Sequence, residues 1–403
     1  MTIAPYFLTA PQAADALGVS PATLYAYTSR GQLRSEPVPG RPRERRYYRE
    51  DVERLRERKE TRRDPAKAAA RGLHWGGPVL ESGITLIHEG KVYYRGHDAV
   101  KLAATASLEQ VAALLWSADE HDRGRLVEQA SALSPRQLAP LRAAAKDSLT
   151  LFQAALPIAG KVDLASYDLR PAAVRLTGAR ILRLLTTIVA PGHAKTAVHR
   201  ALQAAWAPRR SAVGDVIRTA LVLCADHELN VSAFTARCAA SAGASPYDVV
   251  SAALATLKGY KHGGASERLT ALLADAHTLK DARTLIGDRL RRGQQLPGFG
   301  HPLYPSGDPR ARLLLQLADA SGNDRERRRI RSLSKAGEEL LQDLPNLDFG
   351  LAAVTRAYGL PARAPVLLFA LGRTVGWIAH AIEEYASGQL IRPRARYTGP
   401  SPL

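Results

Sequence analysis

Cysteine is nearly absent from this chain of 403 residues, in which only Cys224 and Cys238 occur, both within apolar stretches. Two such cysteines exclude a disulfide scaffold and argue against a zinc site built from thiolates. They favour a reducing compartment, so we expect a cytoplasmic protein.

Long uninterrupted apolar runs are also lacking. Residues 1–12 do not show the basic stretch followed by an apolar stretch that marks a secretory leader. The most apolar segment, residues 366–382, is interrupted by Arg373 and His380. We therefore expect no membrane partner.

Acidic residues are the third deficit. The chain has 38 Asp and Glu against 56 Lys and Arg, which gives a net charge of +18. Residues 1–74 carry +6 of this charge and residues 75–403 carry +12, so the excess is not confined to one segment. Such a charge indicates a polyanionic partner. The alternative is that the excess reflects only an arginine-rich proteome.

The composition of the chain changes near residue 60. The charge-dense run at residues 54–60 leads to Asp64-Pro65, a pattern typical of a helix that leaves its domain and stops. We expect residues 1–56 to form one module and residues 57–76 to form a charged linker.

Beyond this linker, residues 84–87 and 91–94 flank Glu89-Gly90 and predict a β-hairpin. Nearly everything after it is predicted to be helical, beginning with a capping box at Ser107. The sequence therefore predicts a mainly α body.

The N-terminal module has the pattern of two short helices. Thr9 can cap the first helix, Gly18 permits a tight turn, and Ser20-Pro21 can open the second helix. The start of the second helix leaves Thr23 and Tyr25 pointing outward, with a size and polarity that suit base edges.

A basic, aromatic-containing hairpin follows at residues 41–49 and includes Arg43, Arg45 and Arg46, which could contact phosphates. Helix pair and hairpin together resemble the winged helix-turn-helix of the MerR and excisionase families, over about residues 6–56. The resemblance implies binding to double-stranded DNA. The alternative is a small module used only for packing or dimerisation, with the Arg run as a solvated face.

Three polar segments framed by Gly or Pro interrupt the helical body. They are residues 257–267 around His262, residues 296–304 around His301 followed by Asp308-Pro309-Arg310, and residues 344–349 around Asp348. Glycine beside a histidine lets backbone approach a ligand closely, and a carboxylate in a desolvated wall can act as a base. Their separation in the sequence does not by itself show that the three segments meet in space.

These segments, with residues 93–98, 226–232, 372–377 and 391–393, are similar in order and content to the citrate synthase family. The resemblance runs from about residue 80 to the C-terminus. It implies a large helical domain at residues 77–260 and 356–403, a small helical domain at residues 261–355, and a homodimer.

The resemblance also implies site residues for the condensation of an acyl-CoA with oxaloacetate. Asp348 would take a proton from acetyl-CoA, His262 would hydrogen-bond the enol oxygen, and His301 would polarise the ketone. The implied substrate-binding residues are His227, Arg310, Arg373 and Arg392, the last reaching across the dimer. No metal and no cofactor besides the CoA substrate are implied.

Several positions depart from common family forms. Tyr260-Lys261 stand where many members have Pro-Leu, Ser266 stands for Asn, and Pro302-Leu303 stand for Arg-Val. Some of these positions lie near the expected acyl-CoA site, so the choice of acyl chain stays open.

The leading hypothesis is a citrate synthase of the tricarboxylic acid cycle joined to a DNA-binding module. A 2-methylcitrate synthase that uses propionyl-CoA is the nearest variant. The competing hypothesis is a transcription regulator that kept the fold as a metabolite sensor and lost turnover, although its three catalytic candidates are intact.

Overall fold

The computed structural model describes residues 7–38, 41–49, 51–53, 55–56, 80–119, 124–126, 128–145, 147–193, 196–276, 278–395 and 397–400. The chain divides into two compact units, Met1–Glu81 and Ser82–Leu403. The predicted linker at residues 57–76 lies outside the described residues. The predicted large and small helical domains both fall within the second unit, and their boundary stays a prediction.

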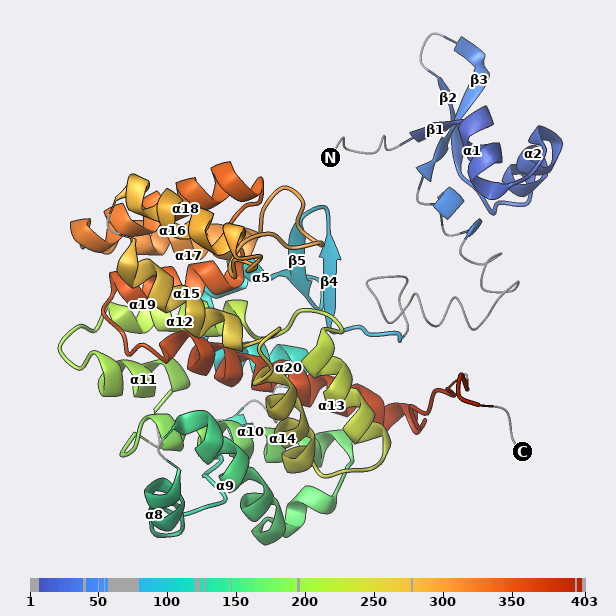
Figure 1. The fold of residues 1–403 in the computed structure, drawn as a ribbon. Helices are drawn as coiled ribbons and strands as arrows, with labels where there is room; N and C mark the ends of the chain where they lie inside the picture. Colours follow the sequence, from blue (N-terminus) through green and yellow to red (C-terminus); the bar gives the residue numbers. More distant parts are fainter. Residues whose placement is uncertain are drawn as a thin grey trace. The chain divides into compact units, whose positions relative to one another are not determined.

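The N-terminal unit is a helix pair packed on a small antiparallel sheet of order β1-β3-β2 (Figure 1). Its elements are β1 (Phe7–Thr9), α1 (Ala10–Leu17), α2 (Pro21–Ser29), β2 (Ser35–Val38) and β3 (Arg41–Tyr48). The predicted helix signals are confirmed, because Thr9 and Ser20 cap the two helices and Gly18 has the left-handed φ of 59°. The predicted hairpin within residues 41–49 is wrong, because this segment forms the single strand β3, which pairs with β2 on one side. On its other side β3 pairs with β1, which was not predicted.

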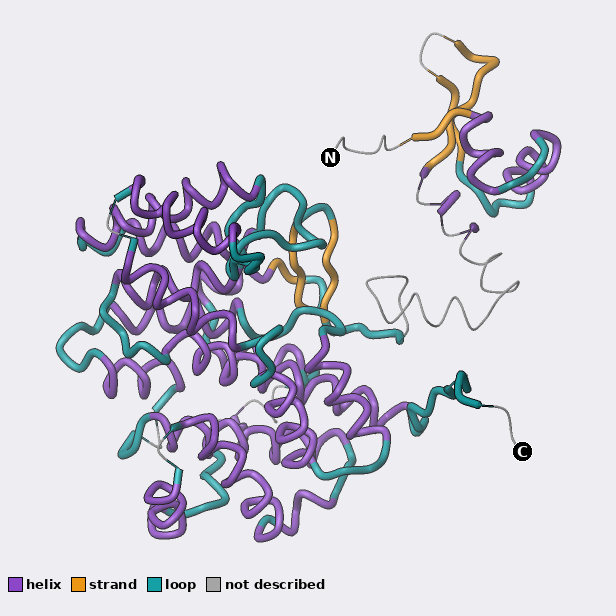
Figure 2. Tube along the Cα trace, viewed as in Figure 1, coloured by secondary structure: helices purple, strands orange, loops and turns teal. Residues whose placement is uncertain are grey.

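The second unit is almost entirely helical, and its described strands form one short sheet (Figure 2). The predicted hairpin is confirmed as β4 (Thr85–His88) and β5 (Lys91–Tyr94), with β6 (His97–Asp98) beside it. The first helices are α5 (Ala99–Thr105), α6 (Leu108–Leu115), α8 (Pro135–Ala144), α9 (Ser148–Val162), the 3-10 helix η1 (Leu164–Tyr167), α10 (Pro171–Val189), α11 (Val198–Trp206) and α12 (Val213–Leu223). The predicted capping box at Ser107 is present at the start of α6.

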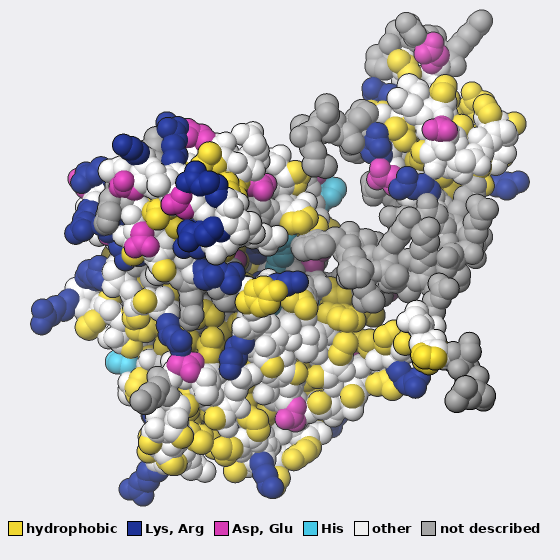
Figure 3. Space-filling view, in the orientation of Figure 1, with side chains coloured by type: hydrophobic (Ala, Val, Ile, Leu, Met, Phe, Trp, Pro, Cys, Tyr) yellow, Lys and Arg dark blue, Asp and Glu magenta, His cyan; other side chains and the backbone are white. Residues whose placement is uncertain are grey.

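The remaining helices carry most of the polar segments. They are α13 (Val231–Ser241), α14 (Pro246–Leu257), α15 (Gly264–Asp275), α16 (Leu279–Arg291), α17 (Pro309–Asp319), α18 (Asp324–Leu341), α19 (Leu347–Ala357) and α20 (Ala364–Ser387). The mainly α fold class is thereby confirmed. Lys and Arg side chains gather over α16 and α18 on the face of the body that Figure 3 shows.

Helix α20 is the central element of the body. By length and composition it could cross a membrane, but its apolar window is entirely buried within the protein. Glycines let it approach the last turn of α12 and the segment that follows. A Cβ at Gly372 would lie 2.5 Å from the Leu221 carbonyl oxygen, and one at Gly376 would lie 2.4 Å from that of Ala225. This close packing sets the backbone that carries His227.

Candidate active site

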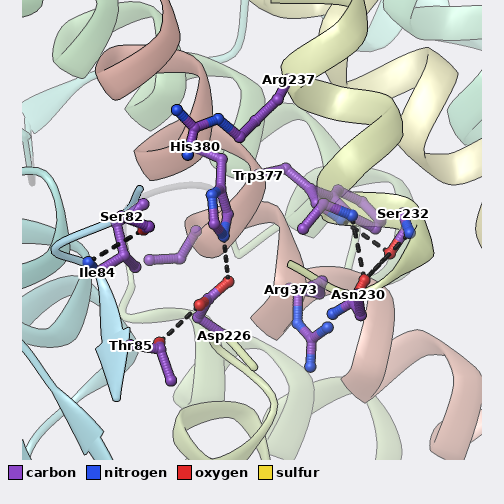
Figure 4. Close-up of polar contacts among 12 residues, drawn as sticks. Ser82, Ile84, Thr85, Asp226, Asn230, Ser232, Arg237, Arg373, Trp377 and His380 are labelled. Atoms are coloured by element: carbon purple, nitrogen blue, oxygen red, sulfur yellow. Dashed lines mark hydrogen bonds and ion pairs between the residues drawn. The ribbon is translucent and has the colours of Figure 1, made fainter. Parts of the chain in front are cut away.

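The segment between α12 and α13 is held by the β-hairpin and by α20. The Tyr94 hydroxyl donates to the backbone oxygens of Val222 and Asp226, at 3.1 and 3.2 Å. The Thr85 hydroxyl donates to Asp226 Oδ2 at 2.6 Å, and His380 Nε2 lies 3.2 Å from Asp226 Oδ1 (Figure 4). Asp226 is fully buried, so these contacts fix the backbone immediately before His227.

His227 and His301 meet in this structure. Their ring centroids lie 4.9 Å apart, and His227 Nε2 is 2.8 Å from the Tyr304 hydroxyl. The Leu303 N–H donates to His301 Nδ1 at 3.2 Å, so the neutral ring carries its proton on Nε2. Burial, together with the positive charge of Arg310, lowers the pKa of His301 to about 4 and that of His227 well below its usual range.

The loop that carries His301 is tied to the loop before α19. Gly300 N–H donates to the Leu344 carbonyl at 2.8 Å, and the Asn346 N–H donates to that of Gly298 at 2.9 Å. Both glycines have positive φ, and a Cβ at Gly298 would lie 2.6 Å from Leu269. A cavity of about 60 Å³ lies between the two loops and is lined by His301 and Asn346 among others.

Asp348 lies in the first turn of α19, whose N-terminus Asn346 caps. Its Oδ1 accepts a 2.7 Å hydrogen bond from the hydroxyl of Ser266, a buried residue of α15. Burial raises the pKa of Asp348, and the hydrogen bond from Ser266 opposes that rise. The charges of Arg310 and Arg373 also act on this carboxylate.

His262 lies in the turn between α14 and α15. Its Nε2 is 2.9 Å from the Ser232 hydroxyl, which also accepts a hydrogen bond from Trp377 Nε1 at 3.2 Å (Figure 4). Burial and the nearby charge of Arg373 lower the pKa of His262 to about 4. The imidazole is therefore neutral at physiological pH.

Two buried guanidinium groups border these residues. Arg310 forms a two-bond ion pair with Asp308, whose Oδ2 also accepts a hydrogen bond from the backbone N–H that precedes Asp348.

Arg373 donates to the Cys224 carbonyl at 2.8 Å and lies 4.6 Å over the Phe369 ring, on which His262 also packs. No carboxylate among the described residues forms an ion pair with Arg373. Burial lowers its pKa, and the negative charge of Asp226 only partly opposes that fall.

One buried donor in this region has no partner within the described part of the chain. The side-chain nitrogen of Asn230 is buried and has no hydrogen-bond partner among the described residues. Asn230 caps α13 and Arg373 lies on α20, and these two helices pack against each other. Figure 4 labels both residues. A buried amide without a hydrogen-bond partner, together with a buried guanidinium that forms no ion pair within the described residues, favours an anionic ligand at this place.

Most of the predicted site residues thus belong to one connected region. His227, His301 and Arg310 all contact the ring of Tyr304. His262 and Arg373 both contact the ring of Phe369. The backbone N–H before Asp348 donates to Asp308. Arg392 is exposed beyond the end of α20 and has no polar contact with these residues in the described chain. Its predicted role across a dimer stays a prediction.

The N-terminal unit carries the residues predicted to bind DNA. Tyr25 is 53% exposed on α2, and the Thr23 hydroxyl lies 3.0 Å from that of Ser20. Arg45 is exposed and donates to Ser35, whereas Arg46 pairs with Glu36 and stacks 4.0 Å over the Phe7 ring. The side chain of Arg43 lies outside the described residues.

Comparison with known proteins decides the family. A model of the citrate synthase C-terminal domain matches residues 72–394, and a helix-turn-helix domain model matches residues 7–60. The chain belongs to the citrate synthase family. The predicted resemblances to this family and to helix-turn-helix modules are both confirmed.

Individual relatives agree with this assignment. Citrate synthase 2 of Bacillus subtilis is 28% identical over 362 residues, which cover 82% of this chain and 96% of the relative. Citrate synthase of Haloferax volcanii is 39% identical over 189 residues, 46% of this chain and 50% of the relative. The citrate synthase of Thermoplasma acidophilum, solved with carboxymethyl coenzyme A and oxaloacetate, is 25% identical with a TM-score of 0.71, covering 83% of this chain and 97% of that one.

Citrate synthase motifs pointed to the histidines, arginines and aspartate, but not to the residues that orient them. Ser232 contacts His262, Tyr304 contacts His227, and Ser266 contacts Asp348. Each of the three lies inside a matched motif, and that place in the motif was the available signal. Within the described residues, no group of three His, Cys, Asp or Glu side chains could hold a metal ion.

Proposed function

We propose that this chain condenses acetyl-CoA with oxaloacetate and water to give citrate and CoA, acting in the cytoplasm as a homodimer. One observation carries the proposal: a carboxylate with a raised pKa, Asp348, shares a buried region with neutral imidazoles and an unpaired guanidinium. Abstraction of a proton next to a thioester needs such a base together with hydrogen-bond donors at the carbonyl oxygen.

Asp348 takes a proton from the methyl group of acetyl-CoA, and His262 donates a hydrogen bond to the developing enol oxygen. The Ser232 hydroxyl donates a 2.8 Å hydrogen bond to Asn230 Oδ1 in the structure. It lies 2.9 Å from His262 Nε2. Rotation of this hydroxyl toward Nε2 would place the imidazole proton on Nδ1, where it can donate to the enol oxygen.

The enol carbon attacks the ketone carbon of oxaloacetate. His301 Nε2–H donates to the ketone oxygen and passes its proton to that oxygen as citryl-CoA forms. The ring is then reprotonated through solvent as Asp348 releases the proton it took. His227 helps to hold the substrate. Two neutral rings suit this role, because burial beside Arg310 keeps both of them uncharged. Water then attacks the thioester carbonyl carbon, and CoA leaves as the thiol.

Arg373, Arg310 and the orphan amide of Asn230 supply donors for the two carboxylates of oxaloacetate. Because Arg310 is already hydrogen-bonded to Asp308, only its remaining N–H groups can donate to a substrate carboxylate. Arg392 of a second copy would complete the set. Exposed apolar residues of α9 and of the adjoining η1 support the dimer; they are Ile158, Val162, Leu164 and Tyr167.

A thiol-release assay tests the enzyme. Wild-type protein should release CoA from acetyl-CoA only when oxaloacetate is present, and Asp348→Asn should lower the rate by at least about 1,000-fold, the scale of losing a catalytic base. Glu89→Gln, an exposed carboxylate of the hairpin, is the matched control and should keep full activity. A silent wild type would favour the metabolite sensor, and faster release from propionyl-CoA would favour 2-methylcitrate synthesis.

We also propose that the N-terminal unit binds double-stranded DNA. The helix-turn-helix match and the exposed outer face of α2 support this second activity. Fluorescence anisotropy with labelled duplex should give an affinity that falls steeply with salt. Arg45→Ala should weaken binding because its guanidinium is exposed, whereas an unchanged affinity would favour a packing module.

A further inference from the structure

The positive charge of the body is concentrated in one stretch of sequence. Residues 279–341 hold 13 Lys and Arg against 8 Asp and Glu, which leaves +5 in 63 residues. The helix α18 carries five arginines within seven positions, at residues 325, 327, 328, 329 and 331. Apart from Arg310 and its partner Asp308, neither the proposed condensation nor the N-terminal unit uses this charge.

Three cations on α18 lack an acidic partner. Arg325, Arg328 and Lys335, which we call the basic face, are exposed and form no ion pair within the described residues. Their spacing of three and seven residues places them along one side of the helix. At a rise of about 1.5 Å per residue, the ten residues from Arg325 to Lys335 extend over about 15 Å.

The acidic residues of α18 are occupied elsewhere. Glu326 is buried and binds Arg329 and Arg356, Asp324 pairs with Arg327, and Glu339 pairs with Arg283 of α16. Glu338 accepts a hydrogen bond from Ser334 at 2.7 Å. The repulsion among the cations of the basic face is therefore not relieved within the chain.

We propose that the basic face binds the phosphate backbone of duplex DNA, as a second contact in addition to the one made by the N-terminal unit. Duplex DNA carries one negative charge per about 1.7 Å of axis, so a row about 15 Å long meets several phosphates at once. The inference rests on the proposed DNA binding by the N-terminal unit. Because both surfaces belong to one chain, the second contact is intramolecular and adds affinity without reading sequence.

Figure 3 is consistent with this assignment, since dark blue side chains gather over α16 and α18 on that view. The basic face lies on the outer side of α18, whose other side packs on α16, α15 and α19 through Ile330, Leu333 and Ala336. Changing the three cations should therefore leave the fold and the proposed condensation intact.

The test uses the full chain with Arg325→Gln, Arg328→Gln and Lys335→Gln combined. The matched control combines Lys91→Gln, Lys101→Gln and Lys161→Gln, three exposed lysines of the same unit, and lowers the net charge equally. Duplex affinity is measured by fluorescence anisotropy over a range of salt concentrations. The basic-face variant should lose about 2 to 3 from the slope of log K against log salt, at 0.9 per lost phosphate contact, while the control keeps the wild-type slope.

Equal weakening in both triple variants would overturn the proposal, because net charge alone would then explain binding. So would a basic-face variant with the wild-type slope when Arg45→Ala binds weakly, an outcome that leaves the N-terminal unit as the DNA reader. Absence of duplex binding by the wild type would overturn both DNA proposals. Competition by polyglutamate as strong as that by DNA would reassign the basic face to an acidic protein.

Discussion

Removal of the Ser266 hydroxyl should move the acid limb of the activity profile to higher pH. This hydroxyl donates a 2.7 Å hydrogen bond to Asp348, and the hydrogen bond holds down a pKa that burial raises. A hydrogen bond to an ionised group contributes about 1.5–3 kcal/mol, and one pKa unit corresponds to 1.36 kcal/mol. In Ser266→Ala, the pH at which kcat/KM for acetyl-CoA falls to half should therefore rise by about one to two units.

The sign follows from the role of the base. Asp348 must be ionised to accept the proton, so a higher pKa removes active enzyme at low pH and leaves activity at high pH largely intact. The thiol-release assay over a pH series measures this directly. Ser266→Cys, of similar size but with a weaker donor, should give a smaller shift in the same direction.

Thr270→Val is the control for a lost hydroxyl on the same helix, because Thr270 donates to the Ser266 carbonyl and has no hydrogen bond to Asp348. Its acid limb should coincide with that of the wild type. If Ser266→Ala also keeps the wild-type acid limb while its overall rate drops, the hydroxyl serves packing only, and the assignment of Asp348 as the titrating base is refuted.

Three further outcomes are expected. The free energy of unfolding should fall as the pH drops from about 6.5 toward 4, because His262 and His301 stay neutral in the folded protein but become protonated in the unfolded chain. Thermal melts of His262→Gln and His301→Gln should therefore depend less on pH than those of the wild type. Gly337→Ala should lower the free energy of unfolding by about 1–3 kcal/mol and also lower turnover. The new Cβ would lie 2.2 Å from the ring of Phe299, which belongs to the loop that carries His301. An unchanged melting temperature would contradict this prediction. Arg46→Ala should lower the melting temperature of the N-terminal unit, measured by circular dichroism, because the variant loses the ion pair with Glu36 and the contact with the Phe7 ring. Loss of DNA affinity at wild-type stability would show instead that Arg46 contacts phosphate.

Local signals predicted the helix boundaries well. Thr9, Gly18, Ser20 and Ser107 act on backbone within four residues of themselves, so the sequence alone carries the information. Strand β1 was missed because three residues have no periodicity to detect, and only pairing with β3 makes them a strand.

The candidate site was predictable only in part, for the same physical reason. The motifs named His262, His301 and Asp348, but each is oriented by a residue or loop that only the folded chain brings to it. The binding of Arg310 to Asp308 illustrates the limit. The two residues are neighbours in sequence, yet the motif suggested a free guanidinium for a carboxylate substrate, and only the side-chain geometry shows that part of its capacity is already used.

The unpaired guanidinium of Arg373 has a consequence for the life of the protein in a cell. A desolvated cation that forms no ion pair within the described residues, and that Asp226 only partly balances, weakens the folded protein, so any dianion that binds to it must strengthen the folded state by mass action. The fraction of molecules open to proteases would then fall as that dianion accumulates. The amount of this protein would thus follow the supply of its own substrate, with no change in its synthesis.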